Sequence, residues 1–208
     1  MKIAILGAGN VGSALGARWA SLGHSVIFGV RDPYTDRVRA LLANIGRNVS
    51  AASVGQATPD AEVVVLATSW QGAPHALSQA GDLSGRVLID CTNPFADGVL
   101  ALGHTTSGAE SVSGWAPGAC VVKAFNTTGS GNMMDADYRG QRPTMFLCGA
   151  DARAKEVTAS LAEELGFEPC DCGPLTVARY LEPVAGLWVQ LAYREGLGMD
   201  IAFKLLRR

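Results

Sequence analysis

The chain has 208 residues, of which 48% are hydrophobic and 17% are charged, and its formal net charge at pH 7 is −2. This charge gives no electrostatic basis for binding nucleic acid. No run of about eighteen apolar residues is present to span a membrane, so a membrane partner is not expected. The first residues predict a strand rather than a secretory signal, and we expect a cytoplasmic protein.

The first predicted elements contain the most informative motif of the chain. An apolar strand at 2–6 is followed by the run 7–12 (Gly-Ala-Gly-Asn-Val-Gly), a helical stretch at 13–22 and a second strand at 25–30. The first glycine permits a tight turn, the second lets the backbone approach a pyrophosphate, and the third lets the helix pack on the strand. This order predicts dinucleotide binding. The residues expected to hold the pyrophosphate are Gly7, Gly9, Asn10, Val11 and Gly12.

The end of the second predicted strand bears on the choice between NAD and NADP. A carboxylate there hydrogen-bonds the ribose hydroxyls, whereas a guanidinium pairs with the 2′-phosphate of NADP. Arg31 falls at this point, and Asp32 follows it directly before Pro33, where the chain is expected to turn away. We therefore predict NADP(H) as the cofactor, with Arg31 on its 2′-phosphate. The alternatives are Asp32 as a ribose ligand and Arg31 as a solvated surface residue.

The middle of the chain alternates between predicted strands and helices. Apolar runs predict further strands at 62–67, 86–90, 120–125, 144–148 and 167–170, with a weaker one near 48–51. Helices are predicted at 34–45, 71–80 and 152–165, and 98–117 is predicted to be a loop with one short helix. Near-continuous Val, Ile and Leu is typical of a parallel sheet covered on both faces. The sequence predicts an α/β fold with a doubly wound, mostly parallel sheet, the Rossmann NAD(P)-binding arrangement.

The last part of the chain is predicted to be a short helical extension. Apolar residues recur at helical spacing between 176 and 194, and 201–206 is predicted to form a short final helix. About thirty residues cannot form an independent domain. We expect residues 1–175 to form the NADP-binding domain and residues 176–208 to pack on it or at a dimer interface, within a single domain overall.

Residues that follow the strands are the candidates for the rest of the site. Ligands of open α/β sheets bind beyond the carboxyl ends of the strands. The residues at these positions are Thr68, Ser69, Trp70, Asn93, Pro94, Asn126 and Thr127. Their short amide and hydroxyl groups suit a carboxamide and a ribose, so we expect Ser69, Asn93, Asn126 and Thr127 to orient the reacting ring. The alternatives are helix-cap and turn roles for the polar residues and simple packing for Trp70.

Other chemistry finds little support in the sequence. Lys123 lies in a predicted strand, where a structural ion pair and a catalytic proton donor are the two interpretations. The three histidines and five cysteines lack the spacing of metal ligands, so no metal site is predicted. No Gly-x-Ser-x-Gly elbow is present. Hydride transfer needs no such nucleophile, because the cofactor carries the chemistry.

Several segments, in this order, resemble a known family. They are the glycine turn, 29–33, 67–70, 90–94, 123–127 and 172–175, followed by 192–198 and 201–204 as C-terminal helices. The chain resembles the NADP oxidoreductases that depend on the deazaflavin coenzyme F420. The resemblance implies hydride transfer between NADPH and a planar small-molecule acceptor, a deazaflavin or a flavin, and it suggests a homodimer. The archaeal members have a histidine where this chain has Asn126 and a serine where it has Val30.

Two other functions fit the amino-terminal motif. An imine reductase of the pyrroline-carboxylate-reductase type shares the glycine clamp but has a larger helical domain for its substrate. A non-catalytic NADP-sensing protein would bind NADPH without oxidising it. Turnover with a panel of acceptors would distinguish these functions.

Overall fold

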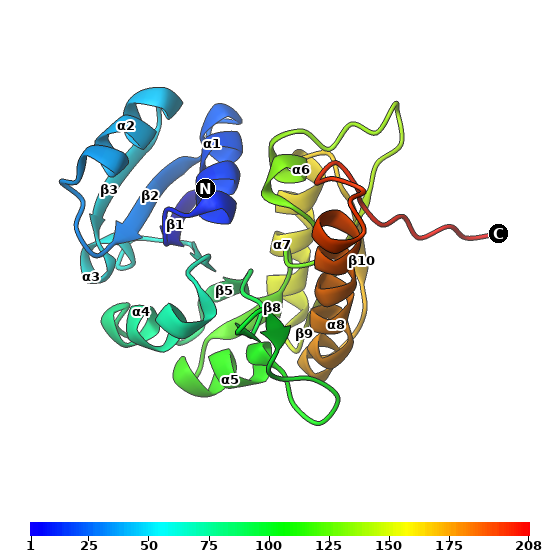
Figure 1. The fold of residues 1–208 in the computed structure, drawn as a ribbon. Helices are drawn as coiled ribbons and strands as arrows, with labels where there is room; N and C mark the ends of the chain where they lie inside the picture. Colours follow the sequence, from blue (N-terminus) through cyan, green and yellow to red (C-terminus); the bar gives the residue numbers. More distant parts are fainter.

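The computed structural model, which describes residues 1–208, has an eight-stranded sheet at its centre (Figure 1). The strands are β1 (Lys2–Leu6), β2 (Ser25–Val30), β3 (Val49–Ser53), β4 (Val63–Leu66), β5 (Val87–Asp90), β8 (Cys120–Lys123), β9 (Thr144–Gly149) and β10 (Glu168–Asp171). Their spatial order is β10-β9-β8-β5-β4-β1-β2-β3. All neighbouring pairs are parallel except β8 and β9. The predicted doubly wound, mostly parallel sheet is confirmed.

Helices cover both faces of this sheet. One face carries α1 (Asn10–Ser21), α2 (Asp36–Ile45), α6 (Ser130–Met134) and α7 (Ala152–Glu164). The other face carries α3 (Val54–Ala57), α4 (Ala73–Gln79) and α5 (Gly108–Trp115). Successive side chains of a strand point to opposite faces. Ile3 and Ile5 accordingly belong to the first core and Ala4 and Leu6 to the second.

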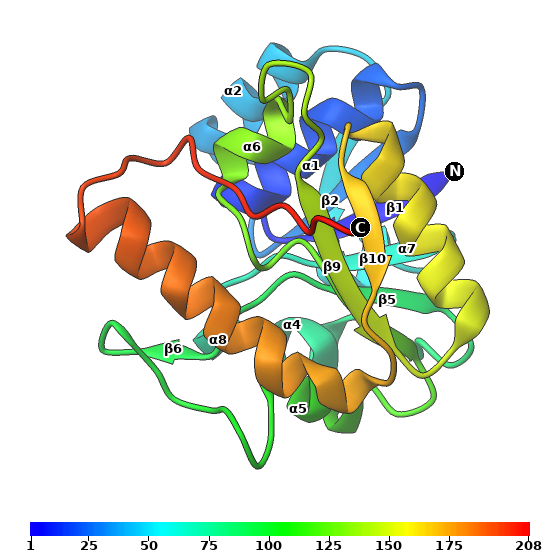
Figure 2. The same cartoon turned by 90° about the vertical axis from the view of Figure 1, so that its right-hand side faces the viewer.

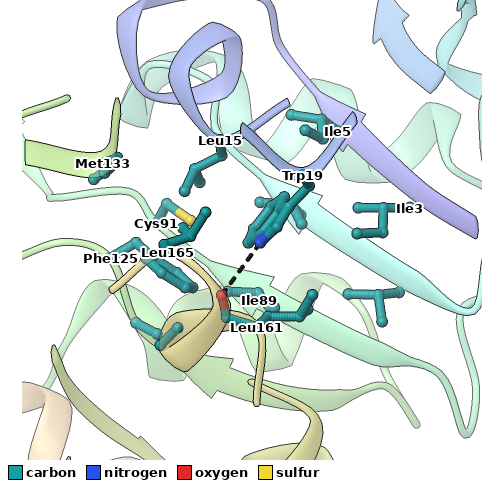
Figure 3. Packing of buried hydrophobic residues seen from close by; sticks show 14 of the residues in the cluster. Ile3, Ile5, Leu15, Trp19, Ile89, Cys91, Phe125, Met133, Leu161 and Leu165 are labelled. Atoms are coloured by element: carbon teal, nitrogen blue, oxygen red, sulfur yellow. Dashed lines mark hydrogen bonds between the residues drawn. The ribbon is translucent and has the colours of Figure 1, made fainter. Parts of the chain in front are cut away.

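The larger core ties the two halves of the sheet together (Figure 3). Trp19 of α1 is fully buried, and its Nε1 donates a hydrogen bond to the carbonyl oxygen of Leu161 on α7 at 3.2 Å. The ring of Trp19 also meets Phe125 edge-on, with centroids 5.7 Å apart. These contacts fix the helices above the strands, so the loops at the strand ends are attached to a rigid layer.

The strand order reverses between β1 and β4, and this reversal positions the site. The chain leaves β1 toward β2 on one side, whereas β4 continues toward β5 on the other. A crevice therefore forms beyond the carboxyl ends of β1 and β4. The glycine turn and the residues after β4 lie at this crevice.

The carboxyl-terminal region differs in part from the prediction. The predicted helix over 176–194 is present as α8 (Ala178–Val189) and a π-helical turn (Gln190–Arg194), and α8 packs beside α5 (Figure 2). The final helix predicted over 201–206 is wrong, because this segment is extended. The amide of Thr144 donates to the carbonyl of Phe203 at 2.9 Å, and the amide of Leu205 donates to Thr144 Oγ1 at 2.9 Å. Backbone groups that pair with a distant strand are not available to a helix.

Several short elements were not predicted. A hairpin of β6 (Phe95–Ala96) and β7 (Val99–Leu100) follows β5, and α3 and α6 each have five residues or fewer. The predicted loop at 98–117 contains the expected short helix, α5. Strand β8 ends at Lys123, two residues before the predicted end at Phe125, which has a left-handed backbone (φ 58°). None of the helices has the length and apolarity needed to span a bilayer.

Candidate functional site

A groove of about 1240 Å³ opens beyond the ends of β1, β2 and β4. Its walls are formed by residues 7–9 after β1, 29–32 at the end of β2 and 67–69 after β4, and Arg37 and His75 contribute from α2 and α4. Its position is the one that the reversal of strand order dictates. Five of the predicted site residues line this groove, namely Gly7, Gly9, Arg31, Thr68 and Ser69.

The glycine turn fits a ligand whose oxygens approach the backbone. Gly7 has φ +106°, and a Cβ built on it would lie 2.7 Å from the carbonyl oxygen of Ala67. A Cβ on Gly12 would lie 2.2 Å from the carbonyl oxygen of Gly7. A Cβ on Gly9 would meet no atom within 4 Å, so this residue leaves open space beside the groove. The first and third glycines are thus required by packing, and the second keeps the backbone accessible. The other predicted pyrophosphate ligands, Asn10 and Val11, form the first turn of α1.

Two arginines lie at the end of the groove formed by β2. Arg31 and Arg37 both line it, and Arg37 Nη2 donates to the carbonyl oxygen of Ala8 at 3.3 Å. Asp32 also lines the groove, but its Oδ1 accepts the amide of Tyr34 at 2.8 Å. Its carboxylate therefore stabilises its own turn, while the guanidinium of Arg31 and the remaining N–H groups of Arg37 can donate to an anionic ligand.

Several residues that line the groove were not predicted from the sequence. Arg37 was detectable as a basic residue in the first turn of the helix after the second strand. Residues 53–55 at the end of β3, with His75 and Gln79 on α4, carry no motif that would have marked them. Strand β3 was predicted only weakly, so its end could not be recognised as part of the site.

Asn93 and Asn126 form a reciprocal amide pair beyond β5 and β8. Asn126 Nδ2 donates to Asn93 Oδ1 at 3.0 Å, and Asn93 Nδ2 donates to the backbone oxygen of Asn126 at 3.0 Å. Asn126 Nδ2 also donates to the backbone oxygen of Leu181 on α8 at 3.2 Å. Asn126 Oδ1 is buried without a hydrogen-bond partner, and so is Thr68 Oγ1 beside the groove. Buried acceptors without partners indicate a polar ligand at this edge of the sheet.

The remaining predicted residues lie behind this edge. Trp70 packs on Trp115, with ring centroids 5.0 Å apart. A Cβ on Gly108 would lie 3.2 Å from Trp70 Cζ3 and 3.3 Å from Pro94 Cδ, so these side chains pack closely around that glycine. Thr127 is buried next to Asn126. Five predicted residues at this edge do not line the groove, namely Trp70, Asn93, Pro94, Asn126 and Thr127.

Lys123 is part of a buried ionic cluster, which we define as Asp90, Lys123 and Glu182. All three side chains are 0% exposed. Lys123 Nζ lies 2.9 Å from Asp90 Oδ2 and 3.0 Å from Glu182 Oε1, and it donates to the carbonyl of Thr92. Burial alone would lower the pKa of Lys123, but the two carboxylates outweigh it and raise that pKa. Lys123 is therefore a charged member of a structural ion pair, and it does not line the groove.

Three of the five cysteines are poor nucleophiles. All five are free thiols. Burial raises the pKa of Cys91 well above its usual range, that of Cys148 to about 12 and that of Cys172 to about 11. A protonated thiol is a weak nucleophile. No group of three or more His, Cys, Asp or Glu side chains is arranged to hold a metal ion.

Comparison with known proteins agrees with this geometry. The family model described as NADP oxidoreductase, coenzyme F420-dependent, matches residues 2–94. The F420-dependent NADP reductase of Methanothermobacter thermautotrophicus is 32% identical, over 93% of this chain and 90% of that protein. The chain belongs to the coenzyme F420-dependent NADP oxidoreductase family. Membership confirms the predicted family, the enzyme class of oxidoreductase and NADP as the cofactor.

Solved structures of other reductases share the fold of this chain. A candidate F420-dependent NADP reductase from Arthrobacter sp. FB24 superposes with a TM-score of 0.91, at 34% identity and complete coverage of both chains. Imine reductase from Myxococcus stipitatus, in complex with NADP+, has a TM-score of 0.69 and covers 94% of this chain and 63% of its own. Its 18% identity shows a shared fold alone.

A metalloreductase is also similar to part of this chain. Metalloreductase STEAP3 of Rattus norvegicus is 30% identical over 88% of this chain. The chain spans about 36% of the length of that relative. The alignment therefore concerns one part of STEAP3.

Proposed function

We propose that this protein transfers hydride between NADPH and a planar acceptor, with the deazaflavin coenzyme F420 as the first candidate and a flavin as the second. The observation that carries the proposal is the groove at the reversal of strand order, which joins the glycine turn to two arginines. The F420-dependent relative of 32% identity supports the choice of acceptor.

One half of the groove suits the phosphates of NADPH. The backbone at Gly7, Gly9, Asn10, Val11 and Gly12 would hold the pyrophosphate, because the open space at Gly9 admits close approach and the first turn of α1 offers unpaired amides. Arg31 and Arg37 would hold the 2′-phosphate, since both guanidinium groups line the same end of the groove.

The other half suits the nicotinamide. Bound NADPH supplies the hydride, so the protein has only to bind, orient and exclude water. Thr68 and Ser69 line the groove, whereas Asn93, Asn126 and Thr127 do not. Ser69 would orient the nicotinamide together with the Asn93–Asn126 amide pair, and the buried Thr127 follows Asn126 directly in the chain. The unpaired Oδ1 of Asn126 is an acceptor suited to an amide N–H. Trp70 and Pro94 close the rear of this edge.

Steady-state kinetics with an acceptor panel test the proposal. Loss of NADPH absorbance is followed with coenzyme F420, a flavin, a ferric chelate and a cyclic imine. We expect turnover with coenzyme F420 or a flavin. Turnover with ferric chelate alone would favour chemistry like that named for STEAP3, and turnover with the imine alone would favour an imine reductase. Saturable NADPH binding without turnover would favour an NADP sensor and contradict the proposal.

Three further predictions belong to the same proposal. Residues 1–175 would form the NADP-binding domain, and residues 176–208 would pack on it or at a dimer interface, within a single domain overall. The resemblance to the family suggests a homodimer. We also propose the cytoplasm as the location, where reduced cofactors and free thiols are maintained.

A further inference from the structure

The buried ionic cluster of Asp90, Lys123 and Glu182 lies directly behind the Asn93–Asn126 amide pair. Asp90 and Lys123 are the last residues of β5 and β8 and are partners in the sheet register. Glu182 reaches them from α8. Burying three charged groups costs free energy, so their presence calls for a specific use.

One set of hydrogen bonds from the cluster fixes Thr92, the residue before Asn93. Asp90 Oδ1 accepts the amide of Thr92 at 2.9 Å and its hydroxyl at 2.7 Å. Lys123 donates to the carbonyl of the same residue. Thr92 is thereby held at its N–H, O–H and C=O groups, which leaves Asn93 little freedom at the next peptide.

A second set of hydrogen bonds connects the cluster to Asn126. Glu182 directly follows Leu181, whose carbonyl accepts Asn126 Nδ2. Glu182 itself is held at both oxygens, because Oε2 accepts the amide of Gly108 at 2.9 Å and Oε1 accepts that of Ala109 at 3.1 Å. These amides begin α5, where a carboxylate is stabilised by the helix dipole. The first part of α8 is therefore fixed relative to the strand ends.

We propose that Glu182 is a positioning residue for hydride transfer, which acts by holding the Asn126 amide in place through Leu181. This inference rests on the proposed nicotinamide site at Asn93 and Asn126. Glu182 itself touches neither the groove nor the amide pair. Its loss should therefore affect the reaction rate and leave the phosphate contacts intact.

The variant Glu182→Gln tests this inference, because it keeps the side-chain size and leaves Lys123 in a balanced pair with Asp90. We expect kcat to fall about tenfold or more, as misplacement of a reacting group costs rate steeply. The Kd for NADPH should change by less than about twofold, since the phosphate end is untouched. The matched control is Glu110→Gln, which breaks another contact between α5 and α8 and should retain the wild-type kcat.

A double-mutant cycle with Asn126→Ala separates positioning from general support. If Glu182 acts through Asn126, the double variant should be no slower than Asn126→Ala alone. In the cofactor-free protein, NMR signals of the Asn126 side-chain amide should shift in Glu182→Gln and remain unchanged in Glu110→Gln. If Glu182→Gln fails to fold, Glu182→Asp, which keeps the charge but shortens the side chain, replaces it in the same cycle with Asn126→Ala.

The outcomes distinguish this inference from the proposed function. Wild-type kcat in Asn126→Ala would overturn the nicotinamide site and the inference together. Two results would overturn the inference alone, provided that Asn126→Ala lowers kcat. One is a double variant whose loss of kcat is the sum of the two single losses, and the other is a wild-type kcat in Glu182→Gln. An unshifted Asn126 amide signal in Glu182→Gln would also overturn it.

Discussion

At the scale of single residues, the two arginines of the groove decide cofactor preference in our account. Arg31 was predicted from its place at the end of β2, whereas Arg37 was not predicted and is brought to the same groove by the first turn of α2. Arg39, two residues further along α2, is 66% exposed, pairs with Asp36 and does not line the groove. It is a matched control for the loss of one guanidinium.

Arg31→Ala should weaken NADPH binding and leave NADH binding unchanged. A hydrogen bond to a charged group is worth about 1.5–3 kcal/mol, so the Kd for NADPH should rise by about tenfold or more. Arg37→Ala should act in the same direction and Arg39→Ala should have no effect, as measured by fluorescence titration with both cofactors. An unchanged ratio of the two affinities in Arg31→Ala would contradict the assignment.

At the scale of elements, α5 and α8 are joined by a partly exposed ion pair in addition to the hydrogen bonds of Glu182. Arg179 donates to Glu110 from Nε at 2.9 Å and from Nη2 at 2.6 Å. The hydrogen bond from Arg179 is the main reason that the pKa of Glu110 is lowered. When folding lowers the pKa of a carboxylate, that group stabilises the folded protein at pH values above its pKa in the unfolded chain. This contribution is lost as the pH falls through the lower pKa of the folded state.

Glu110→Gln should therefore destabilise the protein at pH 7 by about 0.5–1 kcal/mol, which is typical of a partly exposed ion pair. The difference from the wild-type protein should shrink as the pH falls below about 4, where the unfolded carboxylate is already protonated. Urea unfolding of both proteins at pH 7, 5 and 3.5 measures this difference in the free energy of unfolding. A difference that stays constant over this range would contradict the role of the charge.

The strands and crossover helices could be predicted because their signal is local. Continuous apolar runs such as 63–66 mark buried strands, and the glycine turn marks the first crossover. The extended segment at 201–206 could not be recognised, since its backbone partners are Thr144 and Asn132, more than fifty positions away. Glu182 was missed for the same reason, because its partner Lys123 is far away in sequence.

At the scale of the whole molecule, α8 and the turn after it present apolar side chains to solvent. Tyr180, Leu187 and Tyr193 are 68%, 50% and 63% exposed. If the proposed homodimer uses this face, sedimentation velocity should give twice the chain mass of 21.6 kDa. Leu187→Glu should shift the protein toward monomer, whereas Met134→Glu on α6 should not. A wild-type monomer at all concentrations would contradict the dimer.

Deuterium transfer tests hydride transfer to a deazaflavin most directly. NADPH carrying deuterium at the transferable position of nicotinamide C4 is mixed with excess protein and coenzyme F420 for a single turnover, and the reduced deazaflavin is analysed by mass spectrometry. We expect the label on the reduced deazaflavin ring, and Asn126→Ala should slow its appearance while NADPH remains bound. Saturable NADPH binding with no label in the deazaflavin would contradict the account.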